Sequence, residues 1–305
     1  MLNLHAKLKL DKSTWTSPNL ANKFGDDDLR AIGNYVWTGY DTDKASRAGW
    51  ERRAAAGMDL AMQISKEKSF PWPNCSNVAF PLVTIAALQF HARAYPAIIS
   101  GRDVVRCRTG YEPTPEQTAL AEAVGKFMSY QVLEKDTAWE EGHDRLLLNY
   151  AIVGCAFVKS YYSTALHGNT SELVLAQDLV IDYFAKSIET ARRKTHVFPL
   201  SRNDIISGSR ADAAKFRDVS EEPWFKAASS PLTAPDARDG TQPPASSTDA
   251  PFTALEQHVW LDLDDDGYEE PYIVTVEESS RTVLRIVARW EREEDITYNR
   301  AGQVV

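Results

Sequence analysis

The chain has 305 residues, 43% of them hydrophobic, and its 34 basic and 43 acidic side chains give a net charge of −9. This length can bury the core of one large or two ordinary domains, which excludes disorder as the dominant state. The charge is +5 over residues 1–110, −5 over 111–225 and −9 over 226–305. Because such a field repels duplex DNA at long range, it argues against a tight sequence-reading DNA-binding protein.

The N-terminal part predicts helices that end at a rigid turn. It lacks the basic and apolar regions of a secretion signal, so we expect synthesis in the cytoplasm. Apolar residues at helical spacing predict a short helix over 27–37, and a stretch without proline predicts a longer one over 43–68. The proline-rich aromatic segment 69–76 then ends the helical part, because each proline fixes its own φ and restricts the preceding residue.

Residues 78–99 form the most apolar stretch of the sequence. Prolines, His91 and Arg93 interrupt it, so it falls far short of the roughly 20 apolar residues that span a membrane. Apolar side chains occupy nearly every face, which predicts a helix buried all round, inside a domain or between subunits. The loosely alternating residues 102–108 predict a strand.

The central part predicts two helices followed by short strands. Thr114 and Pro115 begin the first helix, which should run to about residue 136, and the second covers 137–152. The elements expected after them are strands over 157–163 and 172–183, a short helix over 188–194, a strand over 195–200, and a helix opened by a capping box of Ser201 and Asp204.

The C-terminal part predicts a linker and an antiparallel meander. Residues 226–254 have almost no large apolar side chains, which predicts a flexible linker or loop. Three strands follow, over 257–263, 272–278 and 281–290. Strand alternation places Arg281, Val283, Arg285, Val287 and Arg289 on one face of the third strand, and Leu284, Ile286, Ala288 and Trp290 on the other.

These elements predict an α+β fold in four segments. An N-terminal polar segment covers 1–50, and a domain of helices with a small mixed sheet covers 51–225. The linker covers 226–254, and the three-stranded antiparallel meander covers 255–305. Two or more packed layers of this kind are typical of α+β proteins.

Candidate metal ligands are few. Cys75, Cys107 and Cys155 are scattered without Cys-x-x-Cys spacing, so we expect reduced, mostly buried thiols and neither a disulfide framework nor a zinc site.

An acidic loop surrounds Gly267, and Asp262, Asp264 and Asp266 match the opening of an EF-hand loop. Position twelve, where an EF-hand has a bidentate glutamate, is Ile273, and strands flank the loop where helices are required. We expect an acidic hairpin turn and no cofactor, with a weak calcium or magnesium site as the alternative.

Two basic groups are candidates for DNA contact. They are Arg192, Arg193 and Lys194 in a short run, and Arg281, Arg285 and Arg289 in a stripe on the third meander strand. Either group could contact phosphates. Glu277 and Glu278 on the neighbouring strand offer the stripe ordinary ion-pair partners, so cross-strand pairing is the alternative.

The sequence contains no motif of serine hydrolases, P-loop nucleotide-binding proteins, zinc proteases or dinucleotide-binding proteins. We therefore predict that the chain is not an enzyme. One different class stays open, a metal-dependent phosphoryl-transfer or nuclease enzyme that uses the cluster from Asp262 to Glu270. Cleavage that needs magnesium or manganese and is lost in an Asp264→Asn, Asp266→Asn double variant would identify it.

The aromatic residues indicate an assembled interface. Most tryptophans lie at or near the ends of predicted elements, where large side chains pack between elements or between subunits. Together with the apolar helix they indicate a large subunit interface. The interface candidates are Trp72, Phe80, Phe90 and Trp139.

Several spaced segments resemble the portal proteins of tailed bacteriophages, especially the short-tailed ones. The similar segments are FPWPNCSNV at 70–78, FPL at 80–82, GCAFVK at 154–159, DLVIDY at 178–183, ARRKTH at 191–196 and the GYEEPY hairpin at 267–272. The resemblance covers about residues 45–300, and residues 226–254 stand in it as an insertion.

The resemblance implies a dodecameric ring at one capsid vertex, made in the host cytoplasm and incorporated into the virion. Double-stranded DNA would pass through the ring during packaging and ejection. The implied partners are other copies of the chain, the major capsid protein, the terminase and tail adaptor proteins, with no membrane. A net charge of −9 per subunit is compatible with a channel in which DNA slides, because each fixed phosphate contact would act as a brake.

Members of this family are longer, and their stem, clip and crown would follow the meander. We therefore expect this sequence to be a truncated one that contains mainly the wing region. Another head-morphogenesis or adaptor protein of the virion is the alternative, and a ring of portal-like shape would count against it.

Overall fold

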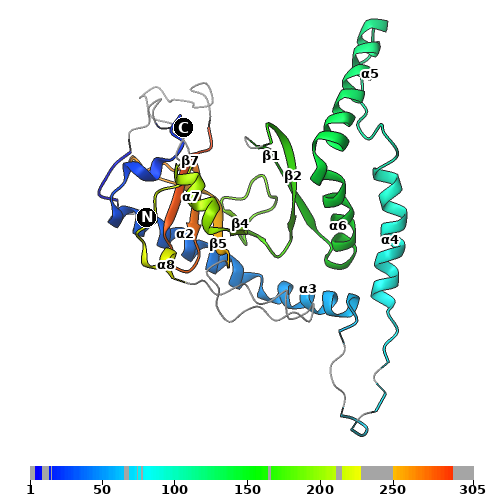
Figure 1. Ribbon diagram of the computed structural model, residues 1–305, viewed down its shortest axis with the longest axis horizontal. Coiled ribbons are helices and arrows are strands. Elements are labelled where there is room, and N and C mark those ends of the chain that lie inside the picture. Colours follow the sequence, from blue (N-terminus) through cyan, green and yellow to red (C-terminus); the bar gives the residue numbers. More distant parts are fainter. Residues whose placement is uncertain are drawn as a thin grey trace. The chain divides into compact units, whose positions relative to one another are not determined.

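The computed structural model describes residues 4–8, 14, 16–64, 69–73, 75–76, 78–163, 166–210, 215–227 and 250–290. The chain divides into two compact units (Figure 1). The sheet unit comprises residues 1–48 and 178–305, and the helical unit comprises residues 49–177. Helices and antiparallel strands both contribute to the fold, which confirms the expected α+β class.

An antiparallel sheet of five described strands forms the centre of the sheet unit, in the order β3-β4-β5-β6-β7. Its strands are β3 (Leu179–Ile181), β4 (Lys194–Leu200), β5 (Phe252–Leu261), β6 (Glu270–Glu277) and β7 (Val283–Ala288). Its helices are η1 (Leu20–Lys23), α2 (Asp26–Ser46), α7 (Arg202–Arg210) and α8 (Pro223–Lys226). The β5–β6 hairpin runs in register from Ala254 opposite Glu277 to Leu261 opposite Glu270.

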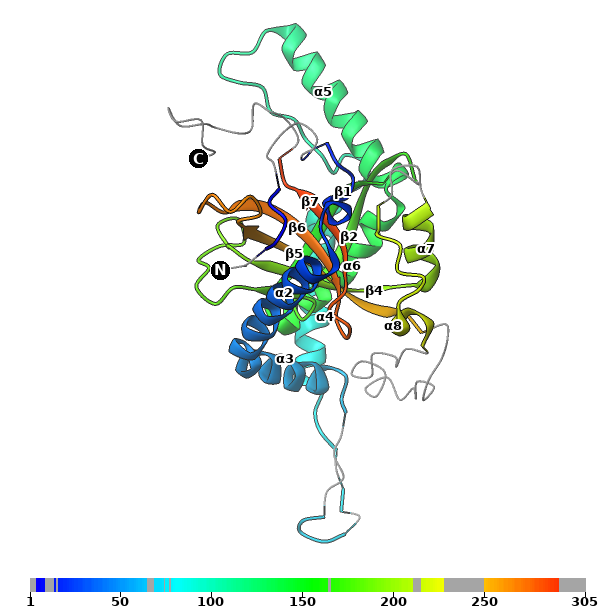
Figure 2. The same ribbon diagram turned by 90° about the vertical axis from the view of Figure 1, so that its left-hand side faces the viewer.

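Helix α2 covers one face of this sheet (Figure 2). Three aspartates in its first turn stabilise the helix, because negative charges interact favourably with the positive end of the helix dipole at the N-terminus. Leu29, Ile32 and Val36 recur at helical spacing and are buried in one cluster with side chains of β5, β6 and β7. Gly33 permits the close approach, because an added Cβ would lie 2.1 Å from the Arg281 carbonyl oxygen.

A second cluster packs around α7, α8 and strands of the same sheet. Phe225 of α8 stacks on Phe252 of β5, and Ile205 of α7 and Leu284 of β7 are buried in the same cluster. The Asp204 amide donates to the Ser201 hydroxyl at 3.1 Å, and the Ser201 amide donates to the Asp204 carboxylate at 3.3 Å. The expected capping box is therefore confirmed.

The outer strand β7 contains an irregularity that changes its faces. The pairing with β6 shifts between Thr275 and Val276, so that Leu284 is the extra residue of a bulge. Val283 therefore packs with Ile286 in the α2 cluster, while Leu284 packs in the α7 cluster. The uninterrupted alternation predicted from sequence is wrong at this point, because a bulge changes which face the neighbouring side chains share.

Asn19 occupies the free edge of β7. Its side-chain amide donates to the Leu284 carbonyl at 3.0 Å, and its side-chain oxygen accepts from the Ile286 amide at 3.1 Å. The Arg217 amide also donates to the Leu284 carbonyl, at 2.8 Å. These contacts satisfy backbone groups that would otherwise be open for pairing with another strand.

The helical unit combines helices with a two-stranded hairpin. Its elements are α3 (Ala48–Ala61), α4 (Leu82–Ile98), α5 (Pro115–Tyr130), the π-helical turn η2 (Gln131–Lys135), α6 (Thr137–Val153), β1 (Ala156–Ser163) and β2 (Gly168–Leu175). Thr114 and Gln117 form a complete capping box at the start of α5. Helix α6 packs against both α4 and β2.

Polar contacts join α4 to its neighbours. His91 Nε2 lies 2.7 Å from Asp144 Oδ1, and the Tyr95 hydroxyl donates to Glu140 at 2.6 Å, so both pairs join α4 to α6. The Thr84 hydroxyl donates to the Ala61 carbonyl at the end of α3, at 2.6 Å.

Several local expectations differ from the structure. Residues 188–193 form turns and irregular structure instead of a helix, residue 194 already belongs to β4, and 102–108 form no strand with any described partner. Strand β5 begins at Phe252, inside the expected linker, and residues 228–249 lie outside the described residues. The cysteines form no disulfide among the described residues, but none is buried, and Cys107 is exposed.

The two units also divide the chain differently from the four expected segments. The N-terminal segment and the meander belong to one unit, because α2 buries its apolar stripe on β5, β6 and β7. The sheet expected within 51–225 is not a mixed sheet: β1 and β2 form a separate antiparallel hairpin, while β3 and β4 extend the meander through β5. Sequence periodicity identifies strands but does not show which distant strand each one joins.

Candidate functional site

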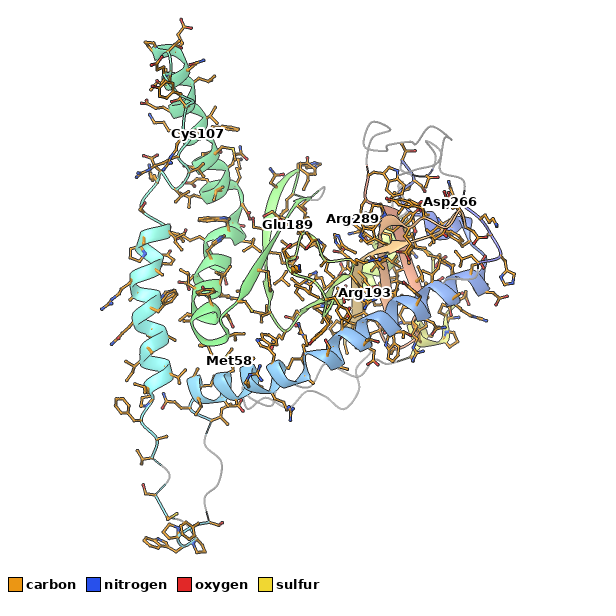
Figure 3. The ribbon with its side chains drawn as sticks, turned by 180° about the vertical axis from the view of Figure 1, so that it is seen from behind. Met58, Cys107, Glu189, Arg193, Asp266 and Arg289 are labelled. Carbon is orange, nitrogen blue, oxygen red and sulfur yellow. The ribbon has the colours of Figure 1, made fainter. Side chains whose placement is uncertain are left out.

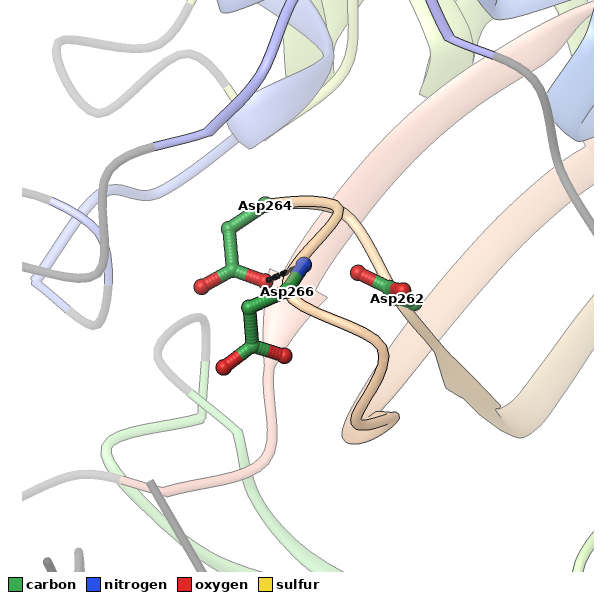
Figure 4. Close-up of side chains that lie close together, drawn as sticks. All are labelled: Asp262, Asp264 and Asp266. Atoms are coloured by element: carbon green, nitrogen blue, oxygen red, sulfur yellow. Dashed lines mark hydrogen bonds between the residues drawn. The ribbon is translucent and has the colours of Figure 1, made fainter. Parts of the chain in front are cut away.

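The acidic loop between β5 and β6 brings Asp262, Asp264 and Asp266 together (Figure 4). One carboxylate oxygen from each lies within 4.8 Å of the others. Asp262 accepts hydrogen bonds from the Asp265 amide at 2.6 Å and the Gly267 amide at 3.0 Å, which folds the chain around it. Gly267 has φ 93°, a left-handed conformation that glycine adopts at little cost.

Glu270, the first residue of β6, is the unexpected member of this region. Its side chain is buried, with 1% of the residue exposed, and neither carboxylate oxygen has a hydrogen-bond partner among the described residues. Burial, followed by the charges of Asp264, Asp266 and Asp262, raises the pKa of Glu270 to about 8. The group of carboxylate oxygens that lie within 4.8 Å of one another is made by the three aspartates and does not include Glu270.

Tyr272 lies two residues further along β6 and is completely buried. Its hydroxyl makes no hydrogen bond of ordinary geometry among the described residues, but it interacts with the Glu270 carboxylate. Burial and then the charge of Glu270 raise the pKa of Tyr272. Both side chains thus bring polar atoms into a region that is otherwise apolar core, which is costly unless something compensates them.

The other two carboxylates of the loop have basic partners. Lys7 Nζ lies 2.6 Å from Asp265, and Arg192 forms an ion pair with Glu269. Within the described part of the chain, the three clustered aspartates and Glu270 form no ion pair with a basic side chain. Burial, followed by the charge of Asp266, also raises the pKa of Asp264.

Sequence analysis identified the three aspartates but did not single out Glu270 as a ligand. A signal was present, since Glu270 stands ninth in the loop counted from Asp262, a position that provides a ligand in EF-hands. Ile273 at position twelve lies inside β6, opposite His258 and Val287, so the loop does depart from an EF-hand there. Oxygen ligands of this kind suit hard divalent cations.

The basic run at 192–194 is largely engaged within the chain. Arg193 makes a bidentate ion pair with Asp43 of α2, with nitrogen–oxygen distances of 2.6 and 2.8 Å, and Asp43 is buried (Figure 3). Arg192 pairs with Glu269, and Lys194 Nζ donates to the Ile188 carbonyl at 2.8 Å. The Arg193 contact is structural, because it joins α2 to the segment that leads into β4.

The arginines of the expected stripe do not act alike. Arg281 lies in the turn before β7, with its guanidinium 3.8 Å from the centre of the Trp37 ring. Arg285 donates to the Pro18 carbonyl at 3.3 Å, and burial lowers its pKa. Arg289 is exposed and lies just after β7 (Figure 3). The pKa of Lys194 is lowered first by its own burial and second by the positive charge of Arg289. The charges of Lys194 and Arg289, from the two predicted groups, therefore repel each other.

The expected partners of the stripe have other roles. None of the three arginines forms an ion pair with Glu277 or Glu278 within the described residues. The Glu277 carboxylate instead accepts from the Ser280 amide at 2.6 Å and from the Ser279 hydroxyl at 2.8 Å, so it closes the β6–β7 turn. Whether Arg192, Arg289 and their neighbours contact DNA stays a prediction.

The interface candidates are exposed to different degrees on the helical unit. Phe80 and Trp72 are 76% and 64% exposed, and Phe90 of α4 is also exposed. Trp139 is half-buried, and its ring lies 4.2 Å from that of His143. Helix α4, expected to be buried all round, has Ala87 as its one buried residue within the described chain.

Neither α4 nor any other helix among the described residues combines the length and the apolar character that crossing a membrane requires. Comparison of the chain with models of known protein families gives no match, and comparison with curated protein sequences gives no match either.

Proposed function

We propose that the chain is a subunit of a phage portal, the ring at one capsid vertex through which double-stranded DNA is packaged and ejected and to which the tail attaches. The observation that carries the proposal is the uncovered apolar surface of the helical unit. The sequence segments similar to portal proteins support the identity of the ring. The virion is the proposed location.

Helix α4 supplies the main physical argument. Its sequence is apolar on nearly every face, and its main contacts within the described chain are with α6 and with the end of α3. Leu82, Leu88, Phe90 and Ile98 are all exposed in the single chain. Burying one such side chain is worth about 1.5–3 kcal/mol, so a helix of this composition favours a second covering surface.

A ring gives each subunit such a cover from its neighbour. In a cyclic assembly two different surfaces of the chain meet at every interface, and the rotation closes after a fixed number of copies. A dodecamer is the proposed number, because the family resemblance implies it. The loop before α4 also has exposed apolar side chains, those of Phe80 and Trp72, which could belong to the same interface.

The charges agree with a passage that does not grip DNA. Arg193 and Arg281 are engaged within the chain, and the overall charge is −9 per copy. A moving duplex would meet few fixed cationic contacts, which keeps the electrostatic drag low. The proposed partners are the major capsid protein, the terminase, tail adaptor proteins and the DNA itself.

A pair of variants on α4 tests the assembly. Leu88→Glu places a charge on the exposed apolar surface, whereas Gln89→Glu adds the same charge at the next, exposed polar position of the helix. Sedimentation velocity should show the large assembly for the unmodified chain and for Gln89→Glu, and mainly single chains for Leu88→Glu. Equal assembly by both variants would refute the role of this surface and favour another head-assembly or adaptor protein.

A further inference from the structure

Helix α5 extends away from the other elements of the helical unit. Its first turns lie beyond α4, α6 and the β1–β2 hairpin in both views (Figures 1 and 2). Gly125 and Ser129 are its buried residues within the described chain. The Val105 amide donates to the Ser129 hydroxyl at 3.0 Å, and a Cβ added at Gly125 would lie 3.2 Å from the Val105 carbonyl oxygen. The face of α5 that carries Gly125 and Ser129 is therefore covered by its own chain.

A different face of α5 carries an exposed apolar stripe formed by Leu120, Val124 and Phe127. These residues are spaced four and three positions apart, so they share one face of the helix. Leu120 and Phe127 are 65% and 59% exposed, and Val124 is also exposed. Short helices gain most of their stability from packing of an apolar face. The stripe therefore favours a cover that the described residues of its own chain do not provide.

Helix α4 has a second uncovered apolar surface on the same unit. Leu88 and Ala92 are exposed, Ile85 is half-buried, and their spacing places all three on one face. The small side chain of Ala92 beside the larger Leu88 leaves a hollow of the kind into which a side chain of a facing helix packs. This surface, called the Leu88 surface below, can accept the larger side chains of the α5 stripe.

The charges of the two helices are complementary. Helix α4 contains Arg93 and no acidic residue, whereas α5 contains Glu116 and Glu122 against Lys126. Two copies of α4 that faced each other would bring like charges together. Strand β1 offers no opposite charge either, because its one charged residue is Lys159. Complementary charges favour a specific partner and register, so they favour α5 as the cover of α4.

We propose that the α5 stripe of one copy packs on the Leu88 surface of the next copy of this chain. The two surfaces lie on different helices, so the contact runs head to tail and can repeat around a closed ring. The inference rests on the proposed function, since it names a contact through which the portal ring assembles. It assigns α5, an element outside the predicted interface candidates, to that interface.

Crosslinking between two chains with single cysteines tests the contact directly. Cys75, Cys107 and Cys155 are replaced by serine, and chains carrying Leu120→Cys or Ala92→Cys are given different affinity tags and coexpressed. A short bismaleimide crosslinker should give a product of about twice the 34.1 kDa chain mass that contains both tags. Val124→Cys and Phe127→Cys with the same Ala92→Cys partner allow for the register of the two helices.

The matched control is Ala119→Cys, which is exposed on α5 but lies next to the stripe in sequence and on another face of the helix. Its product with Ala92→Cys should be lost, and each cysteine variant alone should give none. Crosslinking by all four α5 positions alike would overturn the contact, because a packed helix presents one face to its partner.

A second pair of variants keeps the native cysteines, so it stays informative if the cysteine-free chain does not fold. Leu120→Glu should lose the large assembly in sedimentation velocity, and Ala119→Glu, with the same added charge, should keep it. Circular dichroism checks that both variants are folded. Both positions are exposed in the single chain, so neither substitution disturbs a buried contact.

The outcomes separate this contact from the proposed function. Rings that form without a crosslink from the stripe, and that Leu120→Glu leaves intact, would overturn the α5 contact and leave the portal proposal standing. An unmodified chain that stays monomeric would overturn both. Rings that are lost with Leu120→Glu and crosslinked through the stripe support the contact.

Discussion

Glu270→Gln should stabilise the metal-free chain, and the gain should grow with pH. The pKa of Glu270 is raised from its usual 4.5 to about 8, chiefly by burial. Below pH 4.5 Glu270 is protonated in both the folded and the unfolded states, so its burial does not lower the free energy of unfolding through ionisation. Between pH 4.5 and 8 the unfolded state loses the proton first, and the stability of the folded state falls as pH rises.

The magnitude follows from the size of the shift. Each unit of pKa difference corresponds to about 1.4 kcal/mol, so the cost reaches about 3 kcal/mol at pH 7 and levels off near 5 kcal/mol above pH 8. A neutral glutamine of nearly the same shape avoids the cost of ionisation. The variant should therefore match the unmodified chain near pH 5 and exceed its free energy of unfolding by several kcal/mol at pH 9.

Urea unfolding at pH 5, 7 and 9 in the presence of a chelator measures this difference. Glu269→Gln is the control, because its side chain pairs with Arg192 at the surface and should change stability by less than about 1 kcal/mol at every pH. A difference between Glu270→Gln and the unmodified chain that does not grow with pH would refute the reasoning.

Two further predictions concern contacts that hold the sheet unit together. Arg193→Ala should lower the free energy of unfolding by about 3–5 kcal/mol, because it leaves the buried Asp43 without its partner. The control Arg192→Ala should lower it by less than about 1 kcal/mol. Similar losses for the two variants in thermal unfolding experiments would contradict this assignment. Asn19→Ala should cost about 2–3 kcal/mol, because it removes the contacts to Leu284 and Ile286, and amide hydrogen exchange should rise at Ile286 first. Unchanged protection of that amide would show that another group covers the edge of β7.

Local signals in the sequence predicted much of the secondary structure. The capping residues Thr114 and Ser201 mark helix starts that the structure confirms, because a cap is a contact between residues three positions apart. Alternating apolar residues likewise identified β5, β6 and β7, since residues that pack in the α2 cluster recur at every second position along these strands. These signals depend on neighbours in the sequence and need no knowledge of the tertiary fold.

Long-range contacts could not be predicted in the same way. Asn19 closes the edge of β7 more than 260 residues away along the chain, and no local pattern marks that pairing. The bulge at Leu284 likewise depends on the register with β6. Helix α4 was expected to be buried all round, but within the described part of one chain its only buried residue is Ala87. The composition of a helix shows that its surface favours burial, but it does not show which part of the chain or which other subunit covers it.

The candidate site shows the same division. The aspartates could be identified from their spacing, because turn and ligand positions are local features. The burial of Glu270 could not, since it depends on the pairing of β6 with β5, in which Glu270 lies opposite Leu261. Likewise, the ion pair of Arg193 with Asp43 joins residues 150 positions apart, which a count of basic residues cannot reveal.

The most direct test of the central proposal is the mass and symmetry of the purified chain, from native mass spectrometry and negative-stain class averages. The portal proposal predicts a mass of about twelve times the 34.1 kDa chain and rotationally symmetric rings with a central hole. A mass of one or two chains, without ring-shaped particles, would contradict it.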